Sequence, residues 1–282
     1  MRLFLLTALT MVAFAANSLL NRLALSDGLI GPGGFATLRV ASGACVLVLL
    51  LALRDRSLPS PPRPNPAAIG GLSLYMLGFS YAYVSMDAGL GALVLFGTVQ
   101  ITMFFGALLE GDHPPLRRWI GMGLAFSGLM VVSLPTAPVS VAPLALLLMT
   151  GAGLGWGIYS LVGRKVSDPL RATGWNFAYS LPLVAAILLF WPDEAAPHAG
   201  GVALALLSGG LTSALGYALW YALLPALGAT RGALAQLSAP AIALLLGALF
   251  LGEQITSAAT LSAGMILGGI AIGVFPGRSR RD

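Results

Sequence analysis

The chain alternates between apolar runs of about twenty residues and short connections that hold proline, glycine and charge. A helix rises about 1.5 Å per residue, so about twenty apolar residues cover the roughly 30 Å of hydrocarbon in a bilayer. We therefore predict an all-α integral membrane protein with ten transmembrane helices. The predicted spans are 3–24, 33–53, 66–86, 89–109, 116–134, 143–163, 172–191, 199–221, 229–251 and 255–275.

The composition indicates that lipid is the solvent. Apolar residues make up 57% of the chain, charged residues make up 9%, and the mean hydropathy is +0.89. Soluble domains carry about 25% charged residues, so too few charges are present for a water-soluble surface. The net charge of +5 raises nucleic acid as a partner, but the basic residues are spread thinly instead of forming one basic face. We expect contact with membrane lipid and no nucleic-acid partner.

Lysine and arginine lie almost entirely on one side of the predicted membrane. All of them except Arg22 and Arg39 fall in the tails or in alternate connections. Connections rich in Lys and Arg stay in the cytoplasm, so we predict cytoplasmic N- and C-termini and a multi-pass protein of the bacterial inner membrane. The stretch around Ala13 and Ala15 imitates the cleavage site of a signal peptide. The first helix, however, has a counterpart in an internal repeat.

The internal repeat divides the chain into two units, which we place at 1–136 and 137–282. Residues 91–132 align without a gap on residues 232–273, and the matches fall on small residues in order. Gly111 and Asp112, for example, meet Gly252 and Glu253. Five helices per unit is an odd number, so the second unit must enter the membrane from the opposite side. Inverted repeats of this kind hold a small-molecule site at their interface near the midplane, which indicates a transporter working by alternating access.

Short motifs resemble those of the drug/metabolite transporter superfamily, and within it the ten-helix EamA type. They are Trp156-Gly157-Ile158-Tyr159-Ser160, Gly91-Ala92-Leu93, Gly232-Ala233-Leu234 and Leu251-Gly252-Glu253. The likeness runs over essentially the whole chain. It implies two five-helix repeats, export of amino acids or related metabolites from the cytoplasm, and no ATPase or cofactor. Small members of the superfamily are dimers, whereas this chain contains both halves and could work as a monomer.

The acidic residues all fall at helix ends or in connections. A carboxylate inside the membrane is the usual device for proton coupling, and the predicted spans have none. Transport driven by the substrate gradient is the simpler expectation, with coupling through Glu110 as the alternative. We expect Glu253 to cap the last helix, where the helix dipole favours a carboxylate. No group of residues has the spacing of a metal site or a catalytic nucleophile, and the single cysteine, Cys45, is expected to pack.

Aromatic and uncharged polar residues within the spans are the candidate substrate-binding groups. Ser213, Tyr217 and Trp220 follow one helix face at spacings of four and three, where rings can stack on a side chain while hydroxyls orient a polar head. The other candidates are Tyr75, Phe79, Tyr83, Trp156 and Tyr159, together with the amides Asn17, Gln100, Asn176 and Gln236. The alternatives are that the aromatic residues pack or form interfacial belts and that the amides bond to neighbouring helices.

Two prolines and two arginines complete the candidates. Pro182 and Pro240 would free backbone carbonyls and act as hinges, or form ordinary kinks. Arg22 and Arg39 would attract an anionic group to the outer mouth, or extend to lipid headgroups.

The leading hypothesis from the sequence is an exporter of amino acids, aromatic or large neutral ones. A carrier of nucleotide sugars or phosphorylated metabolites is the second transporter hypothesis, and it requires several basic residues in mid-span, where only Arg39 comes close. An integral membrane enzyme of lipid or isoprenoid metabolism would need clustered Asp, His or Ser at one interface, and the sequence shows no such cluster. A sensor or accessory subunit without transport also remains open.

Overall fold

The computed structural model describes residues 1–57, 60–109, 111, 113–133, 142–163, 166–194, 196–236 and 238–274. The described residues form helices and connections, with no strand among them. The helices are α1 (Arg2–Ser26), α2 (Pro32–Asp55), α3 (Pro66–Ala82), α4 (Ala88–Leu109), α5 (Leu116–Ser133), α6 (Pro143–Gly163), α7 (Pro169–Ala185), α8 (Ile187–Phe190), α9 (Ala199–Leu206), the π-helix η1 (Leu207–Leu215), α10 (Gly216–Gln236), α11 (Ser238–Leu251) and α12 (Ser257–Val274).

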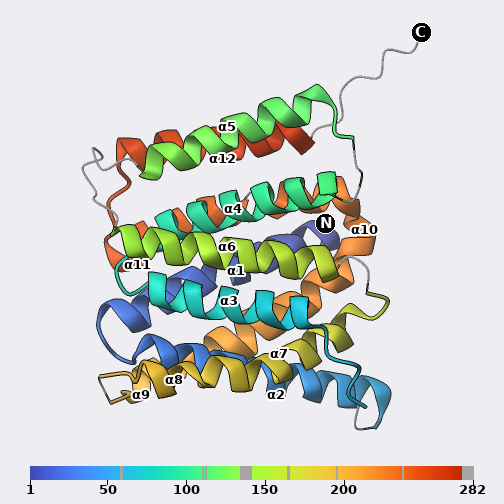
Figure 1. Ribbon diagram of the computed structural model, residues 1–282, viewed down its shortest axis with the longest axis vertical. Helices are drawn as coiled ribbons and strands as arrows, with labels where there is room; N and C mark the ends of the chain where they lie inside the picture. The colour runs from blue at the N-terminus through green and yellow to red at the C-terminus, as the bar shows by residue number, and fades with distance from the viewer. Residues whose placement is uncertain are drawn as a thin grey trace.

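The helices lie side by side and cross the molecule in the same direction or its reverse (Figure 1). One end of the bundle, which we call the Glu253 end, carries the connections from α1 to α2, α3 to α4 and α11 to α12. The other, the Arg54 end, carries the connections from α2 to α3 and α6 to α7. Helix α1 therefore runs toward the Glu253 end and α6 runs away from it, as the prediction of inverted five-helix repeats requires.

The packing of the helices follows the same pseudo-twofold relation. Helix α5 packs on its repeat mate α12 at one edge of the bundle, and α2 packs on its mate α7 at the other (Figure 1). The contact of α4 with α6 is matched by the contact of α11 with α1. The two matching connections even share a backbone conformation, since Gly111 and Gly252 have φ of +90° and +66°, a region that glycine enters without strain. The fold is thus ten membrane-crossing segments in two inverted repeats.

The main differences between the predicted spans and the structure occur at three places. Helix α3 ends at Ala82 instead of residue 86, and the predicted span 172–191 is divided into α7 and α8. We expected a connection between spans 199–221 and 229–251, but α10 is helical throughout this stretch. It cannot be straight, because Tyr217 and Gln236 line one cavity although about 28 Å would separate them along an ideal helix. The stretch includes Pro225 and Gly228, and proline is a common cause of a sharp helix bend.

Glycine allows close contacts between helices at two places. A Cβ added to Gly155 of α6 would lie 2.5 Å from the carbonyl oxygen of Gly71 in α3. In α5 and α12, Gly121 and Gly269 each face the carbonyl oxygen of the other. Small residues let membrane helices approach until their backbones touch, and van der Waals contact then holds them together. Glycines therefore allow these two pairs of helices to pack closely.

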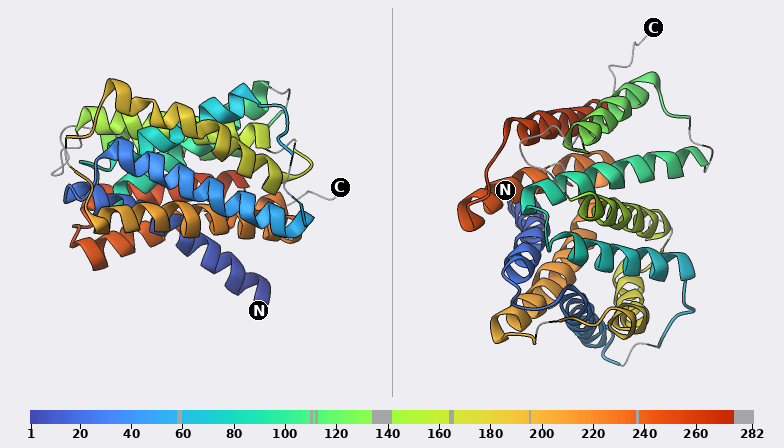
Figure 2. Two further views of the ribbon diagram at one scale, coloured as in Figure 1. Left: turned by 90° about the horizontal axis from the view of Figure 1, so that it is seen from below. Right: turned by 60° about the vertical axis from the view of Figure 1, so that its left-hand side comes forward.

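The outer surface of the bundle is apolar, as a lipid-facing surface must be. Leu109, Leu189 and Phe190 are at least three-quarters exposed. Six of the described helical spans are long and apolar enough to cross a membrane by length and composition. The first turns of α1 diverge from the other helices (Figure 2), and its buried residues begin at Thr10. The predicted boundary between the halves, at residues 136 and 137, lies outside the described residues.

Candidate functional site

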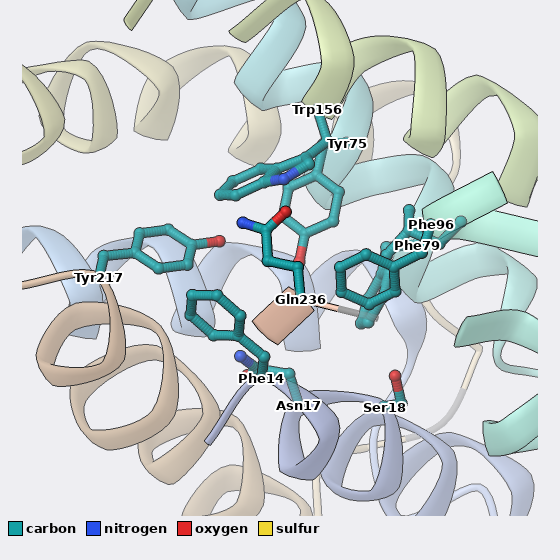
Figure 3. Close-up of a pocket in the computed structure, with 10 residues that line it drawn as sticks. Phe14, Asn17, Ser18, Tyr75, Phe79, Phe96, Trp156, Tyr217 and Gln236 are labelled. Atoms are coloured by element: carbon teal, nitrogen blue, oxygen red, sulfur yellow. The ribbon is translucent and has the colours of Figure 1, made fainter. Parts of the chain in front are cut away.

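A cavity lies between the two halves of the bundle, and five helices contribute its wall. The first half supplies residues of α1, α3 and α4, and the second supplies residues of α6 and α10. The lining residues are Phe14, Asn17, Ser18, Tyr75, Phe79, Leu95, Phe96, Trp156, Tyr217 and Gln236. Their side chains surround the amide of Gln236 (Figure 3). The cavity volume is about 20 Å³, room for about one water molecule, so the cavity must widen before a metabolite can enter.

Aromatic rings form most of the wall, and Trp156 is at their centre. Its ring centroid lies 4.9 Å from that of Tyr75, 5.0 Å from Tyr217 and 5.4 Å from Tyr159. Phe14 meets Tyr217 edge to face at 5.8 Å. Rings at these distances attract one another and also offer their faces to an apolar or aromatic side chain. The wall therefore suits a ligand with a large apolar part.

The polar part of the wall depends on the π-helix η1. The Asn17 side-chain oxygen accepts hydrogen bonds from the hydroxyls of Ser208 at 2.8 Å, Thr212 at 2.6 Å and Ser213 at 3.3 Å. A π-helix has a wider turn than an α-helix, so it brings a different set of side chains onto one face, often at functional sites. Three hydroxyls thereby hold the amide of Asn17 at the cavity.

Arg39 is fully buried beside this cavity, which corrects the expectation that it reaches the outer mouth or the lipid headgroups. Its exposed fraction is 0%, and its Nε donates to the Ser213 hydroxyl at 3.2 Å while Nη2 donates to the Tyr75 hydroxyl at 2.9 Å. Its guanidinium carbon lies 5.3 Å and 4.9 Å from the ring centroids of Tyr75 and Phe79. These rings and hydroxyls hold the Arg39 side chain inside the bundle, so it does not extend to either membrane surface.

The Glu253 end is closed by contacts between the halves, and here the structure corrects a second expectation. Glu253 caps α4 rather than the last helix, since its carboxylate accepts from Ala88 N at 2.7 Å and Gly89 N at 3.5 Å. Arg22 lies 3.7 Å from both Glu253 and Asp87. The last helix is capped instead by the Thr256 hydroxyl, which accepts from Ala259 N. Burial raises the pKa of the Glu253 carboxyl, and the two backbone bonds and Arg22 oppose that rise.

A second carboxylate makes a similar contact at the same end. Asp193 of the second half accepts hydrogen bonds from Gly33 N at 3.1 Å and Gly34 N at 2.6 Å, at the start of α2. Helix N-termini attract carboxylates because their first N–H groups have no partner within the helix. Two helices of the first half, α2 and α4, thus donate hydrogen bonds from their N-termini to carboxylates of the second half.

At the Arg54 end, the contact between halves joins α2 to the start of α7. Arg54 Nη2 lies 2.7 Å from Asp168, whose carboxylate also caps α7 through Arg171 N. The hydrogen bond from Arg54 lowers the pKa of Asp168. Both groups are more than a third exposed, so we assign little stability to this pair. Glu110, the alternative coupling acid, lies outside the described residues.

The structure brings six of the predicted substrate-binding residues to the cavity wall. They are Asn17, Tyr75, Phe79, Trp156, Tyr217 and Gln236. Ser213 lies behind the wall, where it forms hydrogen bonds with Arg39 and Asn17. Tyr159 and Trp220 contact lining rings. Tyr83 packs on Phe79, and its hydroxyl donates to Ala88 O. Gln100 and Asn176 are half-buried and not among the lining residues.

The two predicted hinges occupy different places. Pro182 lies inside α7, three residues before the helix ends at Ala185. Pro240 is the third described residue of α11, and residue 237, between α10 and α11, lies outside the described residues, so the role of Pro240 as a hinge stays a prediction.

The sequence analysis missed four of the lining residues. Phe14 lies one turn before both Asn17 and Ser18, and Phe96 lies one turn before Gln100, so helical spacing could have suggested Phe14 and Phe96. Leu95 carries no signal that separates it from other apolar residues. Arg39 was noticed, but its face on α2 was not assigned.

The site offers stacking surfaces, hydroxyls, amides and one cation, which suit binding better than catalysis. Within the described ranges, no three His, Cys, Asp or Glu side chains come together in a way that could hold a metal ion.

Comparison with known proteins identifies the family of this chain. The model of the EamA-like transporter family matches residues 1–134 and again residues 143–275. A protein of Pseudomonas aeruginosa, described as uncharacterized, is 45% identical over 100% of this chain and 98% of its own length. A probable amino-acid metabolite efflux pump of Salmonella typhimurium is 26% identical over 78% of this chain and 80% of its own. A crystal structure with 19% sequence identity has a TM-score of 0.70 over 96% of both chains, which shows the same fold.

Proposed function

Since the chain belongs to the EamA-like transporter family, we propose that it exports amino acids with aromatic or large neutral side chains by alternating access. The family consists of transporters and not of enzymes, so the chain is a multi-pass membrane transporter with a small-molecule substrate. The substrate class and the direction of transport are the proposal.

The observation that carries the proposal is the aromatic cavity between the halves. Its wall joins Tyr75 and Phe79 of the first half to Trp156 and Tyr217 of the second. A rocking movement of one half against the other changes the separation of these residues, which both opens the cavity and lets substrate reach it. A stack of rings with amides at its edge matches a large side chain attached to a small polar head.

The direction and location of transport rest on two further supports. The Lys and Arg pattern favours cytoplasmic termini, which places the Glu253 end on the outer face of a bacterial inner membrane. The Salmonella typhimurium relative is described as a probable amino-acid metabolite efflux pump. Both halves of the cavity belong to one chain, so we propose that a monomer is sufficient for transport.

Counterflow into proteoliposomes tests the substrate class. Vesicles loaded with an unlabelled amino acid should take up the same labelled amino acid, for phenylalanine, tryptophan and leucine but not for lysine or glutamate. Trp156→Ala should reduce uptake at least tenfold, because Trp156 lines the cavity and contacts the rings of Tyr75, Tyr217 and Tyr159. Trp191→Ala is the matched control, since Trp191 is 70% exposed and is not among the lining residues. Absence of counterflow with every amino acid of a broad panel would refute the proposal.

A further inference from the structure

Arg39 holds a positive charge inside the membrane, far from the ends of its helix. It is the eighth residue of α2, about 10 Å along the axis from the first residue of that helix, Pro32. Its side chain is 0% exposed and among the largest fully buried side chains of the described residues. Charged residues inside a membrane protein are costly, and they usually mark a site for an ion or a substrate.

The charge of Arg39 is not balanced by any carboxylate of the described residues. The groups that accept hydrogen bonds from it are two hydroxyls, those of Ser213 and Tyr75. Within the described part of the chain, no acidic side chain lies within ion-pair distance of it, and its Nη1 has no hydrogen-bond partner although it is buried. A guanidinium can donate five hydrogen bonds, so donors remain for a ligand.

The guanidinium lies directly behind the wall of the cavity. Tyr75 and Phe79 contact it with their rings and line the cavity as well. Ser213 connects its Nε to Asn17, another lining residue. A shift of the Tyr75 side chain when the cavity widens would expose Nη1 and Nη2 to a ligand. Even without that shift, the positive charge acts on the cavity through a medium of low dielectric constant, where it is weakly screened.

Resting on the proposed function, we infer that Arg39 binds the carboxylate of the substrate. A carboxylate supplies the missing negative charge and can accept two parallel hydrogen bonds from a guanidinium. One arginine balances one negative charge, whereas a phosphate monoester carries about −1.5 to −2. The substrate class is therefore a monocarboxylate with a large apolar or aromatic part, and the carboxylate is required for binding.

The ammonium group of an amino acid has no matching requirement. No carboxylate is among the cavity-lining residues, so a positive group would meet ring faces and amides instead of a counter-ion. The 2-oxo acid that corresponds to an amino acid keeps the carboxylate and the side chain and lacks the ammonium. It should bind as well as the amino acid or better, while the corresponding amine, which keeps only the positive group, should not bind.

Three compounds with the same phenyl ring separate these roles: phenylalanine, phenylpyruvate and phenethylamine. Binding to the purified wild-type protein is measured by the ligand-dependent shift of its thermal unfolding and by competition in counterflow. We expect phenylalanine and phenylpyruvate to bind and phenethylamine to bind at least tenfold more weakly. Phenethylamine that competes as well as phenylalanine would overturn the role of the carboxylate while leaving the exporter proposal intact. Transport of phenylpyruvate without phenylalanine would refute the amino-acid proposal and support the role of Arg39.

Variants of Arg39 test whether this side chain itself binds the carboxylate. Arg39→Gln should weaken phenylpyruvate binding about tenfold or more, which corresponds to about 1.4 kcal/mol or more. Arg39→Lys keeps the charge and should retain part of the affinity, which a purely structural role would not explain. Arg54→Gln is the control, because Arg54 pairs with Asp168 at one end of the bundle and does not line the cavity. If Arg39→Gln folds and binds phenylpyruvate as the wild type does, the inference is wrong. If it does not fold, the comparison of three compounds on the wild type decides alone.

Discussion

Replacing Asn17 by alanine removes the acceptor of three hydroxyl groups, and the structure allows its cost to be worked out. Thr212 would keep a bond to the carbonyl of Ser208 at 3.0 Å, so two hydroxyls, those of Ser208 and Ser213, lose an acceptor. Hydrogen bonds between membrane helices are worth about 0.6 kcal/mol on average, so Asn17→Ala should destabilise the protein by about 1 kcal/mol, and by about 2 kcal/mol if the Thr212 bond also weakens.

Reversible unfolding in mixed micelles, followed by the loss of helical circular dichroism as the denaturing detergent is increased, measures this difference. Asn176→Ala is the matched control, because Asn176 is half-buried and makes no hydrogen bond to another described side chain. It should change the free energy of unfolding by less than about 0.5 kcal/mol. If Asn17→Ala is as stable as the wild type, or if both variants lose the same amount, the hydroxyl cluster does not hold Asn17 as described.

Three further variants test the ends and the packing of the bundle. Burial raises the pKa of Glu253, so the folded wild type binds a proton that the unfolded chain has released. The stability of the wild type relative to Glu253→Gln should therefore rise as pH falls through that pKa. Thermal unfolding between pH 4 and 8 measures this difference, and an opposite slope would mean that Arg22 determines the pKa of the carboxyl. Gly155→Leu should cost about 1 to 3 kcal/mol or more, because its side chain would meet the α3 backbone, whereas Gly123→Leu, which has no atom within 4 Å, should be tolerated in the same unfolding assay. Asp193→Ala should cost about 1 kcal/mol by leaving Gly33 N and Gly34 N without their acceptor, while Glu194→Ala at the exposed neighbour should not change the melting temperature.

The general architecture could be predicted from the sequence because the membrane imposes it. Bilayer thickness determines the length of an apolar run, and backbone contacts between helices require small residues at ordered positions such as Gly121 and Gly269. The odd number of spans in each repeat then requires inversion. The helix ends at residues 82 and 185 were less predictable, since apolar residues continue beyond both of them.

The details of the site depend on contacts between helices that the sequence does not display. Helix α2 is apolar around most of its circumference, so its pattern does not show which face Arg39 occupies. Glu253 is six residues from Gly247 in its own half but caps α4, and only the folded arrangement makes Ala88 N available to it. Gly209 has no side chain and so lets η1 lie against the backbone of Arg39, a contact that nothing in the local sequence reveals.

The two carboxylates at the Glu253 end make separation of the halves there a cooperative event. Glu253 and Asp193 belong to the same half and bind the starts of two different helices in the other. A movement that withdraws this half breaks both attachments together, since neither carboxylate travels with the helix that it caps. We therefore expect the two attachments to break together, so that this mouth opens in one step instead of widening gradually.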